Sequence, residues 1–301
     1  MSTMIDRVIF GDNQFFGINH MSQEKAREQA ARFSDLGAIT SVYEIAIDAG
    51  IRAFMLNSND RAMGICDYFR SRKSTHPDLM WYPSIPYPHK YANLVAEKGI
   101  LPAIQSVLFG GGAADAFGMI KQMGSAILFR DELRAMHSLV DLELRAFAGL
   151  NVRAVFLQNV ITDLLLGLGL HEVIADYCDH LRRHHKVIPG LITQNLPRLL
   201  AFLSTHGIEG VAVCASFNKI GYLMSPDVES YTTAASRNDG RAYPIIAMST
   251  LASGAVKPAD AYDFIARQNI QSVVFGASTK AHIGDTIRCL AASGFGDQGV
   301  A

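Results

Sequence analysis

The chain has 301 residues, of which 49% are hydrophobic and 18% are charged, and its formal net charge is −1. This composition is typical of a compact globular protein and excludes an intrinsically disordered chain. No basic run indicates a nucleic-acid surface and no apolar run has the length of a membrane span, so we expect neither nucleic acid nor membrane as a partner.

Eight short apolar runs alternate with helical patterns along the chain and predict eight strands. Their near-continuous hydrophobicity is typical of parallel strands covered on both faces. We expect strands at residues 7–11, 52–57, 79–85, 153–158, 187–192, 210–216, 244–249 and 272–276. We expect helices at residues 22–37, 40–49, 130–150, 169–186, 196–206, 258–268 and 279–292, with Gly37 at the C-cap of the first. The alternation predicts a single (β/α)₈ TIM-barrel domain over residues 1–301.

Two stretches interrupt this alternation. Residues 12–37 hold an extra loop and helix after the first predicted strand, and residues 87–150 form a long segment after the third. Insertions of this kind in a barrel usually follow the carboxyl end of a strand and shape the mouth of the site. We therefore expect helical insertions after strands 1 and 3.

The last two predicted strands each end in a loop of small and hydroxyl-bearing residues before a helix. The first loop contains Ser249, Ser253 and Gly254, and the second contains Gly276, Ala277, Ser278 and Thr279. Free backbone N–H groups at a helix N-terminus bind anions. Ordinary turns also use these residue types, but two such loops in succession predict the phosphate or pyrophosphate site that many TIM barrels have at this place.

Residues 245–254 and 273–287 resemble the seventh and eighth strand regions of the aldo-keto reductases, and residues 46–54 and 190–195 resemble earlier parts of that family. The resemblance implies an aldo-keto-reductase-like barrel, with NAD(P)(H) as a cofactor held by the last strand and helix. The family's catalytic Asp, Tyr, Lys and His positions fall on Met55, near Asp60, near Ser84 and near Asn159. The resemblance therefore implies the fold without the usual catalytic tetrad.

Polar residues concentrate at the carboxyl ends of the predicted strands, where barrel enzymes carry their sites. Carboxamide groups donate and accept at fixed geometry, which suits a carbonyl or polyhydroxylated ligand. We expect substrate-binding roles for Asn13, Gln14, Asn57, Gln158 and Asn218. Asn195 precedes Leu196 and Pro197 and is interpreted as a turn or N-cap residue.

Lys219 is the candidate nucleophile because it follows a buried strand between Phe217 and Ile220. A lysine desolvated among apolar neighbours has a lowered pKa and can form a Schiff base with a carbonyl compound. A phosphate-binding lysine and an ordinary surface lysine are the alternatives. The other candidate catalytic residues are Asp12 and Asp60 as general bases or metal ligands, Asn159 beside the lysine, and His20.

Neither the histidines nor the cysteines follow a metal-binding motif, so we predict no metal. His180, His184, His185 and His206 are interpreted as surface residues of helices. The four scattered cysteines are typical of free thiols in a reducing compartment, and the N-terminal residues lack a signal-peptide pattern. We therefore expect a cytoplasmic protein.

The sequence predicts a lyase, such as an aldolase, or an isomerase that acts on a small phosphorylated or polyhydroxylated carbonyl substrate through an enolate or Schiff base. One alternative is an NAD(P)(H)-dependent oxidoreductase with a non-standard acid, such as Asp60 or Lys219. Another is a non-catalytic ligand-binding barrel. The expected partner is a small, anionic molecule; the identity of the substrate and the oligomeric state stay open.

Overall fold

The computed structural model describes residues 4–16, 31–86 and 128–295. In these ranges eight parallel strands pair in chain order, and β1 also pairs with β8, which closes the barrel. The strands are β1 (Val8–Phe10), β2 (Ala53–Asn57), β3 (Met80–Ile85), β4 (Ala154–Leu157), β5 (Ile188–Thr193), β6 (Ala212–Ser216), β7 (Ile245–Met248) and β8 (Ser272–Phe275). Each overlaps a predicted strand, so the predicted TIM barrel is confirmed.

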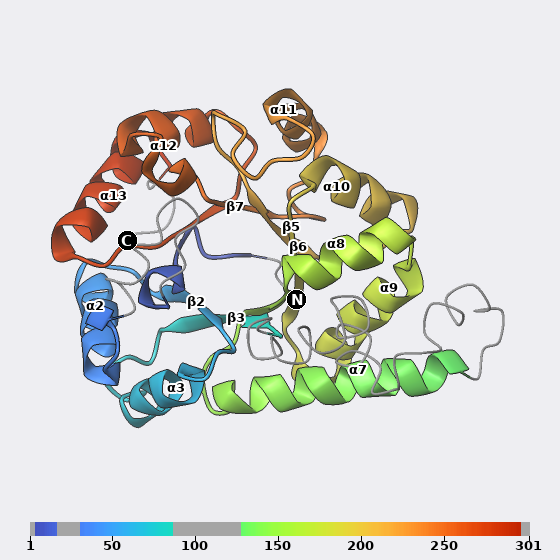
Figure 1. Ribbon diagram of the computed structural model, residues 1–301, viewed down its shortest axis with the longest axis horizontal. Helices are drawn as coiled ribbons and strands as arrows, with labels where there is room; N and C mark the ends of the chain where they lie inside the picture. Colours follow the sequence, from blue (N-terminus) through green and yellow to red (C-terminus); the bar gives the residue numbers. More distant parts are fainter. Residues whose placement is uncertain (1–3, 17–30, 87–127, 296–301) are drawn as a thin grey trace.

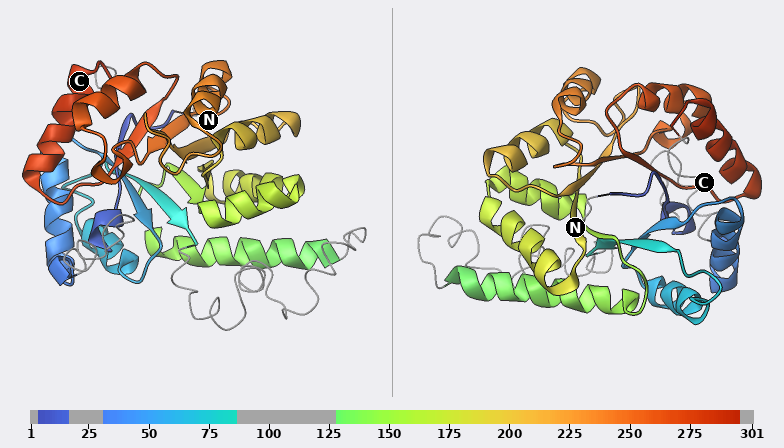
Figure 2. Two further views of the ribbon diagram at one scale, coloured as in Figure 1. Left: turned by 45° about the horizontal axis from the view of Figure 1, so that its top comes forward. Right: turned by 180° about the vertical axis from the view of Figure 1, so that it is seen from behind.

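Helices surround the strands on the outside of the barrel (Figure 1). They are α2 (Leu36–Asp48), α3 (Ala62–Ser71), α7 (Leu128–Leu144), α8 (Asn159–Leu168), α9 (His171–His180), α10 (Leu196–Thr205), α11 (Val228–Arg237), α12 (Pro258–Ala266) and α13 (Lys280–Ala292). The two further views show the same ring, with the long α7 along one side (Figure 2). No helix of the described residues is long and apolar enough to cross a membrane.

The strands are buried on both faces, as their continuous apolar runs predict. One cluster of buried side chains lies between the strands and the helices, and a second, which includes Met55, Tyr82, Phe156 and Ile246, fills the barrel interior. Because all eight strands are parallel, their carboxyl ends meet at one end of the barrel. The polar residues that follow the strands are therefore brought together there.

Some helix boundaries differ from the prediction. Gly37 does not end a helix; it lies in the first turn of α2, which begins after Asp35 because the Asp35 carboxylate accepts a hydrogen bond from the Ala38 N–H. Helices α3, α8 and α11 were not predicted. Helix α8 follows β4 directly, with no side-chain hydrogen bond from its N-cap residue Gln158, so it lacks the usual start signal.

The helix predicted at residues 169–186 is divided. Gly169, with φ of 72°, ends α8, and α9 then runs from His171 to His180. A π-helical turn, Leu181–His185, follows, and Lys186 in the left-handed conformation ends it. This turn places two histidines in positions that a regular α-helix would not give them.

Two predicted features lie partly or wholly outside the described residues. The insertion after β1 is described only at residues 12–16 and 31–37, so His20 is not included. The insertion after β3 is described only from residue 128 onward, as α7 and the 3₁₀ turn Arg145–Phe147 that follows it. The helical character predicted for the rest stays a prediction.

Replacement of Asn195 by alanine should lower the free energy of unfolding by about 1 kcal/mol. Asn195 is the N-cap of α10, and its side-chain oxygen accepts a hydrogen bond from the Arg198 N–H at 3.2 Å. Alanine leaves that N–H without its side-chain partner. Urea unfolding monitored by circular dichroism measures the change, and N195D, which keeps an acceptor, should lose less than N195A. Equal losses in the two variants would contradict the capping role.

Candidate active site at the barrel mouth

A cavity of about 630 Å³ opens at the carboxyl ends of the strands. Residues at or after all eight strands line it. The carboxyl ends of the strands are the usual place of an active site in this fold. The lining residues are Gly11, Asp12, Asn13, Gln14, Met55, Asn57, Ser84, Gln158, Asn159, Ile192, Gln194, Ser216, Tyr222, Leu223, Met248, Ser249, Thr250, Leu251, Ser253, Gly254, Val274, Phe275 and Gly276. Among the lining residues that the structure describes, Asp12 is the only one with a carboxyl group, and none is a lysine, arginine or histidine.

A buried hydrogen-bond network joins the ends of four strands in the wall of this cavity. The Asn57 backbone N–H and side-chain N–H₂ donate to the two carboxyl oxygens of Asp12, at 2.9 and 2.6 Å. Gln158 in turn donates to the Asn57 side-chain oxygen at 2.6 Å and to the Ser84 hydroxyl at 2.7 Å. The network fixes the orientation of the Asp12 carboxyl group, because both of its oxygens are engaged by one residue of β2.

Burial changes the acidity of Asp12. Its side chain is 2% exposed, and removal of the carboxylate from water raises the pKa of Asp12 to about 7. The hydrogen bonds from Asn57 act in the opposite direction, since they stabilise the ionised form, but they are the smaller effect. The residue is therefore suited to both donating and accepting a proton near neutral pH.

Gln14 presents an unsatisfied acceptor in the same wall. It lies in the 3₁₀ turn Asn13–Phe15, and its side-chain N–H₂ donates to the Gly11 carbonyl oxygen at 2.7 Å. That contact fixes which way the amide points. Its Oε1 is then buried without a hydrogen-bond partner. A buried acceptor of this kind indicates a donor group on a ligand, because an unpaired buried polar atom costs about 1–3 kcal/mol.

Gly276 lies directly beside Gln14, and a larger residue at this position would require the Gln14 side chain to move. A Cβ atom at Gly276 would lie 2.2 Å from Gln14 Oε1. The absence of a side chain lets the end of β8 approach Gln14 closely and keeps this part of the cavity open.

The loop after β7 forms a neighbouring part of the wall, with backbone in an uncommon conformation. Ser249, Ala252, Ser253 and Gly254 all have positive φ, between 46° and 92°. Three of these are not glycine, and non-glycine residues in this region indicate local strain that the surrounding structure must hold. Ser249 contacts the Ser216 hydroxyl at 3.3 Å, and Ser253 contacts the Tyr222 hydroxyl at the same distance. Ser249, Ser253 and Gly254 line the cavity. The phosphate or cofactor binding predicted for them stays a prediction.

Two predicted catalytic residues, Lys219 and Asp60, lie elsewhere. Lys219 does not line the cavity; its side chain is 43% exposed, and its ammonium group lies 3.9 Å from Asp260 on the outer helix α12. The expected position beside Asn159 is therefore wrong, because the chain turns outward after Asn218. Asp60 is exposed and does not line the cavity.

Asn218 is buried, but its side chain holds its own loop. Its amide donates to the Tyr222 carbonyl oxygen at 2.8 Å and accepts from the Tyr222 N–H at 2.9 Å. The expected contact of Asn218 with a ligand is thus replaced by a positioning role, because these bonds turn the loop so that Tyr222 faces the cavity. Tyr222 itself was missed by sequence reasoning, since nothing local marks it.

The second predicted anion loop contributes only Gly276 to the cavity lining. Ala277, Ser278 and Thr279 do not line it. Thr279 is the N-cap of α13, and its hydroxyl accepts a hydrogen bond from the His282 N–H at 3.2 Å. One of the free N–H groups on which the predicted anion site depended is therefore already occupied.

Sequence reasoning also left Gln194 outside the candidate site residues. Gln194 lies at the end of β5, where the Asp163 carboxylate accepts hydrogen bonds from its N–H and from the Thr193 hydroxyl. Asp163 and Gln194 both belong to the polar residues that follow the predicted strands, so this pattern could have identified them. The structure adds their roles: Asp163 supports the end of β5, and Gln194 lines the cavity.

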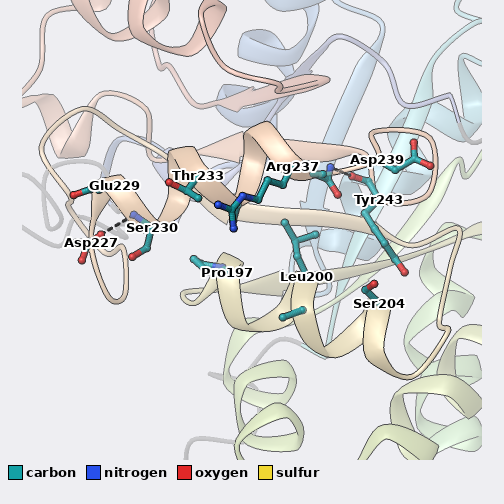
Figure 3. A pocket seen from close by; sticks show the side chains of 13 residues that line it. Pro197, Leu200, Ser204, Asp227, Glu229, Ser230, Thr233, Arg237, Asp239 and Tyr243 are labelled. Carbon is teal, nitrogen blue, oxygen red and sulfur yellow. Dashed lines mark hydrogen bonds between the residues drawn. The ribbon is translucent and has the colours of Figure 1, made fainter.

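A larger hollow, of about 730 Å³, lies on the outer surface between α10 and α11 (Figure 3). Its polar residues serve local structure: Asp227 caps α11 by accepting from the Ser230 N–H at 2.7 Å, and Asn238 donates to the Tyr243 carbonyl oxygen at 2.8 Å. None of its lining residues belongs to a strand, whereas the carboxyl ends of the strands line the barrel mouth, so the mouth is the better candidate despite its smaller volume.

No protein-family model matches the sequence, and a comparison with curated proteins found no significant match. Solved structures do match. A Pseudomonas aeruginosa protein that has been assigned to the aldo-keto reductases aligns over 96% of this chain and 91% of its own, with 12% identity and a TM-score of 0.59. An aldo-keto reductase from a Medee basin deep-sea metagenome library covers 100% of this chain and 94% of its own at 10% identity, with a TM-score of 0.52. The chain has the (β/α)₈ barrel fold of the aldo-keto reductases.

Proposed function

We propose that the protein is an NAD(P)(H)-dependent oxidoreductase that interconverts a carbonyl compound and an alcohol, with Asp12 as the proton-transferring group. The observation that carries the proposal is the Asp12 carboxyl group, which is buried at the mouth of an aldo-keto-reductase-like barrel and has a pKa near 7. Reduction of a carbonyl group needs a proton as well as a hydride, and a group with this pKa can supply that proton at neutral pH.

The residues of the mouth fit the nicotinamide end of a dinucleotide. Gln14 Oε1 is a buried acceptor without a partner, and a carboxamide N–H₂ group is the kind of donor that would satisfy it. Gly276, directly after β8, and Gly254, in the loop after β7, both line the cavity and carry no side chain that would cover their backbone. When bound, the dinucleotide supplies the hydride, while Gln14 and the β7 loop would hold it.

The proton transfer follows from the network around Asp12. As the carbonyl oxygen of the substrate gains negative charge, protonated Asp12 donates its proton to it, and the C=O group becomes a C–OH group. The carboxylate that forms is stabilised by the two hydrogen bonds from Asn57. Gln158 and Ser84 hold the Asn57 side chain in place. In the reverse direction the Asp12 carboxylate removes the hydroxyl proton.

The lyase hypothesis loses its central residue. A Schiff base needs an amine at the mouth, and Lys219 is exposed beside Asp260. None of the described residues that line the cavity carries an amine. The non-standard acids considered from the sequence, Asp60 and Lys219, both lie off the cavity lining, so Asp12 takes that role in the proposal.

The same lining favours a neutral, hydroxylated carbonyl substrate over an anionic one. Asn13, Asn57, Gln158, Asn159 and Gln194 offer amide donors and acceptors, and no positively charged side chain stands among the described lining residues.

The four cysteines are free and three of them are buried, which supports the cytoplasm as the compartment.

Titration of the tag-free protein with NADH and NADPH tests the proposal directly. We expect saturable binding of one of them with micromolar affinity, read from the fluorescence of the dihydronicotinamide ring. Stabilisation in a thermal-shift assay should follow the same concentration dependence. Absence of saturable binding of both dinucleotides up to millimolar concentration would overturn the proposal.

G276A should weaken dinucleotide binding at least tenfold. The added methyl group would meet Gln14 Oε1 and force that side chain to move, which disturbs the acceptor that faces the cavity. G284A is the matched control: it adds the same methyl group on α13, where a Cβ atom meets nothing within 4 Å. Equal affinities in G276A and wild-type protein would contradict the role assigned to this wall.

A further inference from the structure

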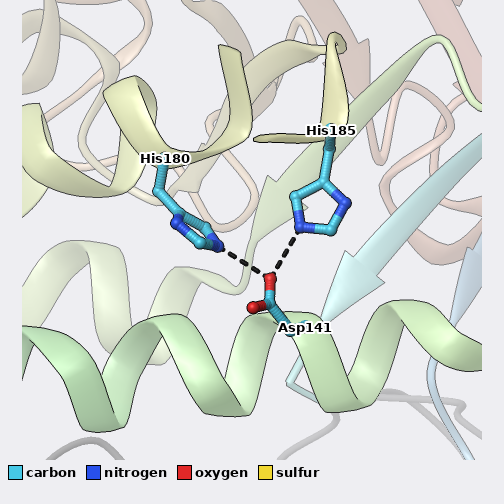
Figure 4. A group of neighbouring side chains, drawn as sticks. All are labelled: Asp141, His180 and His185. Carbon is cyan, nitrogen blue, oxygen red and sulfur yellow. Dashed lines mark hydrogen bonds and ion pairs between the residues drawn. The ribbon is translucent and has the colours of Figure 1, made fainter. Parts of the chain in front are cut away.

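Asp141, His180 and His185 converge on one point at the outside of the barrel (Figure 4). Asp141 lies on α7, His180 is the last residue of α9, and His185 is the last residue of the π-helical turn. The Nε2 atom of each histidine lies 2.7 Å from Asp141 Oδ1. The ligand atoms of the three residues all lie within 4.8 Å of one another.

The π-helical turn is what brings the two histidines together. On an α-helix, residues five apart in sequence point about 140° away from each other. The wider turn of Leu181–His185 closes on the fifth residue instead of the fourth, so His180 and His185 face the same carboxylate. Such turns are rare and frequently occur at functional sites.

The cluster is placed away from the barrel mouth. Asp141 precedes β4 and His185 precedes β5, so both lie beside the amino ends of strands, whereas the cavity lies at the carboxyl ends. The cluster connects α7 with α9, two helices of different βα units. Its position indicates a role in holding these helices together and not in the reaction at the mouth.

The side chains around the cluster orient the histidines. The ring of His180 is 6% exposed and stacks on the ring of His137, with centroids 4.0 Å apart and planes 10° apart. His137 Nε2 in turn contacts Asp176 Oδ2. The interpretation of His180 as a surface residue is thereby corrected.

The donor set and its access match a divalent transition-metal ion. Two imidazole nitrogens and a carboxylate oxygen are common zinc ligands, and in a tetrahedral site such atoms lie about 3.3 Å apart. The two 2.7 Å contacts would lengthen by about half an ångström, and the two histidine nitrogens, which lie within 4.8 Å of each other, would adjust by side-chain rotation. A cavity of about 420 Å³ lined by Asp141 and His185 adjoins the cluster and leaves room for ion entry and for a water ligand.

We propose that Asp141, His180 and His185 form a binding site for a divalent transition-metal ion of the zinc class, which fixes α7 to α9 at the end of the barrel opposite the mouth.

Metal titration of the chelator-treated, tag-free protein tests this site. We expect one equivalent of Zn²⁺ to bind with micromolar or higher affinity in calorimetry and to raise the melting temperature by several degrees. Mg²⁺, which prefers oxygen ligands, should give neither effect at the same concentration.

H185Q and D141N should each weaken Zn²⁺ binding at least tenfold. Both side chains are partly exposed, so the variants should fold, and circular dichroism checks this. H184Q is the matched control, because His184 lies in the same turn, is exposed, and does not belong to the three ligands. H206Q controls for binding at a separate exposed histidine.

Three results would overturn the proposal. The first is the absence of Zn²⁺ binding to wild-type protein below millimolar concentration, which would leave a cluster held by hydrogen bonds alone. The second is stoichiometric binding that H185Q and D141N leave unchanged. The third is a loss of binding in H184Q equal to that in H185Q. Dinucleotide binding by the metal-free protein is measured separately, so failure of this site does not affect the proposed reaction.

Discussion

Replacement of Asp12 by asparagine should lower kcat by about 10²–10⁴-fold, the usual contribution of a general acid–base group. The carboxamide cannot release a proton, although it keeps the size of the side chain and can accept one of the two hydrogen bonds from Asn57. Dinucleotide affinity should change by less than threefold, because Asp12 acts on the substrate oxygen. Steady-state kinetics and the fluorescence titration measure the two effects separately.

The pH profile adds a readout that a structural role of Asp12 would not change. Since burial raises the pKa of Asp12 to about 7, carbonyl reduction by wild-type protein should fall as the pH rises through 7, and alcohol oxidation should rise over the same range. The residual activity of D12N should lack this transition. D67N, which removes an exposed carboxyl group on α3, should keep the wild-type profile. A D12N variant with wild-type kcat would exclude Asp12 as the proton donor.

The same carboxyl group makes stability depend on pH. The pKa of Asp12 is raised in the folded state from the ordinary value of 3.8, so the folded protein retains a proton that the unfolded chain releases. The contribution of Asp12 to the free energy of unfolding is therefore largest below about pH 4. It declines by up to about 4 kcal/mol as the pH rises to about 7. D12N should have a lower free energy of unfolding than wild type at low pH. The difference should become smaller or reverse as the pH rises.

The barrel itself could be predicted because the pattern that indicates it, apolar strand runs that alternate with helices, extends over many residues. Each strand is a short run of apolar residues, buried on both faces, and eight such runs alternate with helical patterns, so one ambiguous run does not change the interpretation. The carboxyl ends of parallel strands must also meet. This is why Asp12, Asn57 and Gln158, which are far apart in sequence, could be assigned to one site.

What could not be predicted depends on the path of single loops. Lys219 and Tyr222 follow the same strand, but hydrogen bonds of the Asn218 side chain turn the loop so that Tyr222 faces the cavity and Lys219 faces Asp260. The sequence did not predict the Asp141–His180–His185 cluster for a similar reason. Its ligands come from two helices, and only the π-helical turn aligns them, so no sequence motif records their proximity.

Replacement of Gly190 by alanine should lower the free energy of unfolding by about 1–3 kcal/mol. Gly190 on β5 is paired with Phe156 on β4, and a Cβ atom at Gly190 would lie 2.5 Å from two atoms of the Phe156 ring. Phe156 is fully buried in the barrel interior, so its ring has little free space to retreat into. Urea unfolding monitored by circular dichroism measures the loss.

A double-mutant cycle identifies the cause. F156L should itself destabilise the protein by leaving a cavity, but it should also make room for the added methyl group. The loss in G190A/F156L should therefore be smaller than the sum of the two single losses, by about 1 kcal/mol or more. G167A, whose Cβ atom meets nothing within 4 Å on the exposed face of α8, should be neutral or slightly stabilising. Additive losses in the cycle would show that Gly190 is required for a reason other than the approach of Phe156.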